Sequence, residues 1–158
     1  MSPDRKAALV LALAAALAIP AEGLRQYAYR DPAGILTVCY GSTTAIEAGR
    51  HYGLEECRDR LDREMAAALG VVERCQPGLP AEVKAAFGDA VYNLGPAIAC
   101  NSTASRMLAA GDIAGACDQL PRWNKVRIAG VPVELPGLTK RRAAEQMLCR
   151  QGIGGGNG

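Results

Sequence analysis

The chain has 158 residues, a formal net charge of +2 and six cysteines. This length predicts a single domain that can bury a core and divide into two lobes. The nearly balanced charge excludes a general electrostatic footprint for nucleic acid and leaves only a weak preference for anionic polymers.

An apolar, alanine-rich run from Ala7 to Ala21 follows Arg5 and Lys6 at the N-terminus. As a helix it would span about 22 Å, less than the roughly 30 Å of a bilayer's hydrocarbon core. Three interpretations are open: a signal peptide cleaved after Ala16–Ala18, a weak membrane anchor that inserts and later leaves the bilayer, or a buried core helix. In all three, Glu22 remains in the mature chain.

The next segment changes character and predicts a small β-hairpin lobe over residues 22–50. Asp31-Pro32-Ala33-Gly34 is a turn signal, and Ile35, Val38 and Tyr40 favour short extended pieces on its far side.

After this lobe the chain is helical, which predicts a helical lobe over residues 51–150. Apolar positions recur at steps of three and four from Leu54 to Val72. Further helices are expected from Leu79-Pro80 to Leu94, from about Ser102, from Ile113 to Leu120 and from Leu138 to Arg150, with a loop or small hairpin over 121–137. Residues 151–158 read as a flexible glycine-rich tail. The fold class is therefore α+β, with a cleft between the lobes.

The cysteines are spread along the chain, at Cys39, Cys57, Cys75, Cys100, Cys117 and Cys149. They form no Cys-x-x-Cys pair, and the single histidine, His51, stands apart from them, whereas tetrahedral metal sites usually recruit closely spaced pairs. We therefore expect disulfides in an oxidising compartment, with no metal and no cofactor. Six buried thiols in a cytosolic protein are the alternative.

Two carboxylates and a hydroxyl, Glu22, Asp31 and Thr37, follow the spacing Glu-x8-Asp-x5-Thr. Glycoside hydrolysis needs one carboxyl that is protonated and one that is ionised. Glu22 follows the apolar run, where burial favours the protonated form, and Asp31 lies in a wetter turn. Thr37 could hold a water. The spacing alone fits an ordinary helix-end Glu, a turn Asp and a strand Thr equally well.

The flanking residues add a family resemblance. Residues 22–43 read EGLRQYAYRDPAGILTVCYGST, which resembles the active-site segment of phage T4-type lysozymes, the endolysins of glycoside hydrolase family 24. VYNLG at 91–95, GDIAGACDQLPRW at 111–123 and GLTKRRAAE at 137–145 are similar to the helical lobe of the lambdoid-phage branch. Several ordered motifs between Glu22 and Cys149 make a specific signal.

The resemblance implies a lysozyme-like fold and a muramidase that hydrolyses the β-1,4 bond between N-acetylmuramic acid and N-acetylglucosamine in peptidoglycan. Glu22 would be the general acid, Asp31 would orient or activate a water that Thr37 places, and the outcome would be inversion. Tyr92, Asn93 and Arg142 are candidates for substrate contacts. The family usually has Gly-His-Thr where this chain has Gly41-Ser42-Thr43, so an orienting histidine contact is absent.

The resemblance also bears on the termini and partners. Some family members carry a signal-anchor-release segment, which Ala7–Ala21 resembles, and this implies a monomer in the host periplasm, first tethered to the inner membrane. Among fifteen possible connectivities, we expect the disulfides Cys39–Cys57, Cys75–Cys100 and Cys117–Cys149, which join sequential elements. The alternative function is a catalytically inactive lysozyme fold that only binds peptidoglycan.

Overall fold

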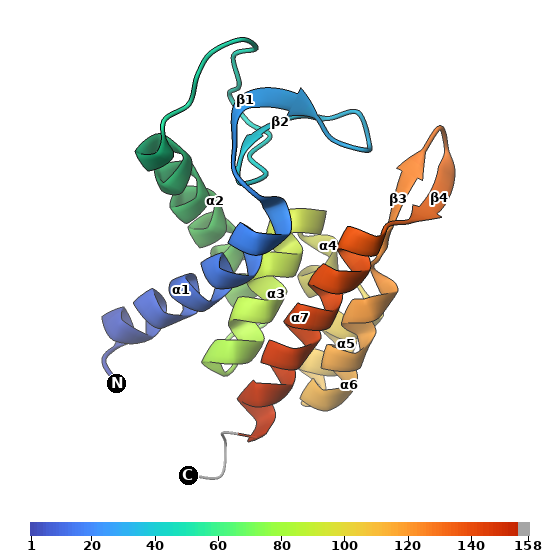
Figure 1. Ribbon diagram of the computed structural model, residues 1–158. Coiled ribbons are helices and arrows are strands. Elements are labelled where there is room, and N and C mark those ends of the chain that lie inside the picture. The colour runs from blue at the N-terminus through green and yellow to red at the C-terminus, as the bar shows by residue number, and fades with distance from the viewer. Residues whose placement is uncertain (155–158) are drawn as a thin grey trace.

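The computed structural model describes residues 1–154 as a helical body that carries two antiparallel β-hairpins. Both hairpins lie at one end of this body, and the N-terminus lies at the other end (Figure 1). The α+β class is therefore confirmed. The elements are α1 (Pro3–Glu22), β1 (Arg25–Arg30), β2 (Leu36–Cys39), α2 (Leu54–Cys75), α3 (Ala81–Leu94), α4 (Ala97–Cys100), α5 (Thr103–Ala109), α6 (Ile113–Gln119), a 3-10 turn (Leu120–Arg122), β3 (Lys125–Ile128), β4 (Val131–Glu134) and α7 (Pro136–Gly154).

Helix α3 is the centre of the core. Its middle, from Ala85 to Val91, is buried on every side because α1, α2 and α7 all pack against it. Apart from Asp89, these residues are apolar or glycine, and a helix that is apolar on nearly all sides is stable only when neighbouring helices cover it. The helical body therefore forms around α3, with Phe87 fully buried at its middle.

The N-terminal segment is one of the helices around α3. Ser2 caps α1 and Pro3 begins it, and the buried face of the helix consists of Val10, Ala14, Ala15 and Ala18. In this folded state the segment is thus a core helix, the third of the open interpretations. Among residues 1–154, no helix has the combined length and apolar character needed to cross a membrane.

The remaining helices follow the sequence closely, with two exceptions. Ser102 caps α5 through a capping box with Ser105, as its position predicted. The short α4 was not expected. Helix α7 runs to Gly154, so the prediction of a flexible tail from residue 151 is wrong, and only residues 155–158 of that tail lie outside the described part. The extension forms because Gly152 is buried against Val83 of α3, with no room for a side chain between them.

The two hairpins differ in regularity. Residues 125–134 form the continuous β3–β4 hairpin, the second of the two forms expected for this region. In the first hairpin, Tyr29 pairs with Thr37 and Arg25 with Cys39, and the register shifts between these pairs. This irregularity bends β1 over the end of the helical body (Figure 1).

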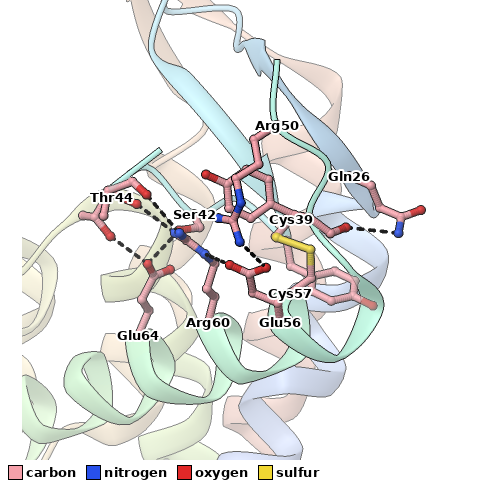
Figure 2. Close-up of a disulfide and its surroundings, with 12 residues drawn as sticks. Gln26, Cys39, Ser42, Thr44, Arg50, Glu56, Cys57, Arg60 and Glu64 are labelled. Carbon is pink, nitrogen blue, oxygen red and sulfur yellow. Dashed lines mark hydrogen bonds and ion pairs between the residues drawn. A yellow bond between two sulfur atoms is a disulfide. The ribbon is translucent and has the colours of Figure 1, made fainter. Parts of the chain in front are cut away.

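Three disulfides tie the elements together: Cys39–Cys57, Cys75–Cys100 and Cys117–Cys149. These are the expected pairs. The first disulfide joins the end of β2 to the first turn of α2 (Figure 2), so the β lobe is fixed covalently to the helical body.

Candidate active site

A cavity of about 320 Å³ lies where the β lobe meets the helical body. It brings together five of the six residues expected to form the catalytic and substrate-binding site. They come from four places in the chain: the end of α1, the β1–β2 turn, strand β2 and the C-terminal half of α3. They are Glu22, Asp31, Thr37, Tyr92 and Asn93.

Glu22 is the last residue of α1, so its position is fixed by the packing of that helix. The side chain is 17% exposed and accepts a hydrogen bond from Nη1 of Arg141 on α7. Its setting is therefore shielded from solvent, and a guanidinium touches the carboxylate.

Position 41, in the segment after β2, requires a glycine. Its backbone has φ +84°, and a Cβ built there would lie 2.5 Å from Cδ of Glu22. The carboxyl group of Glu22 thus occupies the space that any side chain at position 41 would need.

Asp31 and Thr37 are held by the backbone of the β1–β2 turn. Asp31 Oδ1 accepts from the backbone N–H of Ile35 at 2.8 Å, while the Thr37 hydroxyl donates to the Ile35 carbonyl at 2.9 Å. Ile35 therefore sets both groups, and the carboxylate and the hydroxyl keep acceptor sites for a water. Thr37 is almost fully buried and Asp31 is half-buried.

Tyr92 connects the two lobes across this cavity. Its hydroxyl donates to the backbone carbonyl of Tyr40 at 2.6 Å, which joins α3 to the segment after β2. Burial, reinforced by the negative charges of Glu64 and Glu22, raises the pKa of Tyr92 well above its ordinary value. Burial and Glu22 also raise the pKa of Tyr29 on the opposite wall. Both phenols are thus neutral donors at any physiological pH.

Arg142, which the sequence suggested as a candidate for substrate contact, does not line the cleft. It is fully buried and pairs with Glu145 at 2.6 Å, so it cannot touch a substrate in the cleft. Its neighbour Arg141 is the arginine that reaches the site. Adjacent residues on a helix point about 100° apart, so the sequence indicates that only one of Arg141 and Arg142 can face the cleft. Which of the two does so depends on the orientation of α7.

Ser42, which stands where the family usually has histidine, does not leave a gap. Its hydroxyl donates to Glu64 at 2.7 Å and accepts from Arg60 at 3.2 Å, while Arg60 also donates to the carbonyl of Thr44 (Figure 2). A serine hydroxyl carries no charge and forms no ion pair, and here it bridges the guanidinium of Arg60 and the carboxylate of Glu64, both on α2.

The cleft continues beyond Tyr92. A second hollow of about 310 Å³ shares Gly41, Thr43, Val91, Tyr92 and Gly95 with the first and extends along α2 as far as Glu64 and Val71. Two adjoining hollows make an elongated groove, which suits a polymeric substrate better than a small molecule.

Comparison with known proteins gives the same family. Residues 20–145 match the family described as phage lysozyme. The SAR-endolysin of Bacteriophage PS119 is 37% identical over 133 residues, which is 83% of this chain and 77% of the relative. The SAR-endolysin of Pseudomonas phage phiKMV is 34% identical over 148 residues, 93% of this chain and 91% of the relative.

Among solved structures, the active form of the P1 phage endolysin Lyz shares the fold, with a TM-score of 0.77 at 23% identity over 89% of this chain and 84% of that one. Fold, cleft and relatives agree, and this chain belongs to the phage lysozyme family.

Proposed function

We propose that Glu22, Asp31 and Thr37 carry out the muramidase reaction of this endolysin, the hydrolysis of the β-1,4 bond between N-acetylmuramic acid and N-acetylglucosamine in peptidoglycan. One observation carries the assignment: three residues from a helix end, a turn and a strand line one cleft between the lobes. A carboxyl on each side of a sugar-sized space is the arrangement that glycoside hydrolysis requires.

In this mechanism, Glu22 gives its proton to the glycosidic oxygen as the bond from that oxygen to the anomeric carbon breaks. A water attacks the anomeric carbon from the opposite face, and its proton passes to the Asp31 carboxylate. The Thr37 hydroxyl accepts a hydrogen bond from this water and so orients it, because its own proton is donated to Ile35. The sugar product has inverted configuration at the anomeric carbon.

Replacing Glu22 by Gln tests the assignment, because the amide keeps the shape of the side chain and cannot deliver the proton. E22Q should lose clearing of purified cell walls in a turbidity assay while its urea unfolding curve stays close to that of the wild type. Full clearing by E22Q would contradict the role of Glu22. An unchanged turbidity with the wild-type protein would favour the inactive, peptidoglycan-binding alternative.

The stereochemical outcome is a separate test of the mechanism. Proton NMR of the first products from a soluble glycan fragment should show the α anomer, because a water attacks opposite the β bond. Initial release of the β anomer would mean a retaining reaction and would remove Asp31 from its role as water activator.

We also propose that the enzyme acts in the host periplasm as a monomer. Residues 7–21 first tether it to the inner membrane and then leave the bilayer without being cleaved from the chain. The relatives named SAR-endolysin support this. So does the core, since cleavage after Ala18 would remove the buried face formed by Val10, Ala14, Ala15 and Ala18. The intact mass of the active, exported protein should equal the full length, whereas a loss of about eighteen residues would indicate a signal peptidase.

A further inference from the structure

Arg141 makes more use of a second carboxylate than of Glu22. It is almost fully buried, and its Nε and Nη2 donate to the two oxygens of Asp89 at 2.9 and 2.7 Å. Only Nη1 is directed at Glu22. Asp89 lies on α3 and is fully buried, so this fork-to-fork pair is shielded from solvent.

A guanidinium beside a general acid poses a chemical problem. A positive charge within hydrogen-bond distance favours the ionised form of a carboxyl group, whereas a general acid has to hold its proton until the bond breaks. The conflict is relieved if a second carboxylate already neutralises the guanidinium. Asp89 meets this requirement: burial alone would raise the pKa of Asp89, but the hydrogen bonds and charge of Arg141 outweigh burial and hold it below the usual range.

We propose that Asp89 is a positioning residue for the reaction: it takes two of the three nitrogens of Arg141 and neutralises its charge, so that Nη1 orients Glu22 without stripping its proton. This inference rests on the proposed role of Glu22 as the acid. Asp89 does not line the cleft, and its link to Glu22 runs through Arg141. It also faces the buried Glu145 on α7, whose pKa is raised by burial and by the neighbouring Asp89.

Other charged or titratable groups near Glu22 do not take over this task. Arg142 and Glu145, on the same helix as Arg141, pair with each other at 2.6 Å. The other titratable groups around the cleft are Tyr29 on β1, Asp31 in the β1–β2 turn, Glu64 on α2 and Tyr92 on α3. Two further cations are near: Arg25 lies against the Tyr29 ring, and Lys140 lines a hollow with Ala21 and Arg141, but neither has a salt bridge to Glu22 among those found in the described residues. Asp89 is therefore the carboxylate whose loss would leave the guanidinium that contacts Glu22 without its paired negative charge.

The test is the pH dependence of kcat/KM on soluble peptidoglycan fragments for D89N, which keeps the shape of the side chain and removes its charge. Activity of a general acid falls as it ionises, so the alkaline limb should move to lower pH by about one unit or more. On that limb the rate should fall about tenfold or more, with a smaller change at acid pH. A uniform loss with an unmoved limb would overturn the proposal, because it would indicate a structural role only.

D118N is the matched control, since it breaks an exposed pair between Asp118 and Arg150 on α7. Its pH profile should overlay that of the wild type. If D89N does not fold, the double replacement D89L/R141M decides, because apolar residues often replace a buried ion pair without loss of stability.

In D89L/R141M the cation and its partner are both gone. Its alkaline limb should lie at or above the wild-type pH, although kcat falls because Glu22 is no longer oriented. A limb at lower pH than the wild type would refute the charge-balancing role. E22Q in the same assay separates the two proposals: if E22Q is active, the proposed function fails and not only the role of Asp89.

Discussion

The packing of α1 can be tested with two leucine replacements, A14L and A16L. Ala14 is fully buried against the helical body, whereas Ala16, two residues further along the same helix, is exposed. Both variants make the N-terminal segment more apolar by the same amount. Any difference between them therefore reports packing in the folded enzyme and not the hydropathy of the segment.

The size of the effect follows from the space at each position. A leucine at position 14 replaces the methyl group by an isobutyl group where no surface is exposed, and overpacking a well-filled core typically costs about 1–3 kcal/mol. For a domain of this size that lowers Tm by roughly 2–12 °C. At position 16 the added group projects into solvent, so the free energy of unfolding should change by less than about 0.5 kcal/mol.

Urea denaturation followed by circular dichroism measures both variants, with the slope m checking that the unfolding transition is the same. A14L should have a lower midpoint than A16L and the wild type. Equal midpoints for A14L and A16L would refute the assignment of Ala14 to the core and, with it, the argument that cleavage of α1 would remove part of the fold.

Two further predictions concern the cleft. G41A should lower the rate of wall clearing by about 100-fold, because its Cβ would displace the Glu22 carboxyl. The control is G49A, which has a similar φ of +81° with open space around it and should clear walls normally. Similar rates for the two variants would contradict the contact between position 41 and Glu22. Y92F should unfold about 1–3 kcal/mol more easily at pH 7, since the Tyr40 carbonyl loses its donor. Because the pKa of Tyr92 is raised in the folded state, its contribution to the free energy of unfolding is complete below about pH 10 and is lost as pH rises through the folded pKa. The difference in stability between Y92F and wild type should therefore narrow at higher pH. A constant difference in urea unfolding at pH 7 and 11 would count against this account.

Local patterns predicted the parts of the cleft that are close together in the chain. Asp31 and Thr37 are six positions apart, and a turn followed by a strand brings them near each other without help from the rest of the fold. The apolar face of α2 and the capping serine of α5 are likewise properties of a few neighbouring residues.

Contacts between distant segments could not be derived this way. Arg141 meets Asp89 across 52 positions and Glu22 across 119, and sequence reasoning selected the adjacent Arg142 because both arginines fit the motif. Which of the two faces the cleft depends on the rotation of α7 about its axis, and the packing of α7 against α3 sets that rotation. The same packing explains the end of α7, where glycine composition suggested a tail but Gly152 lies against Val83.

Helix α1 sets the distance and the rotation between its buried face and Glu22. Its buried alanines and Glu22 belong to one helix, which continues through Pro20 to Glu22, so inserting one residue after Ala18 would turn the packing face by about 100° relative to Glu22 and shift it by about 1.5 Å. An insertion before Val10 would only lengthen the overhang. Insertions and deletions near the N-terminal end of the apolar segment should therefore be tolerated in evolution. In the last three turns of α1 they should not be, because there the helix sets the position of Glu22 relative to the catalytic cleft.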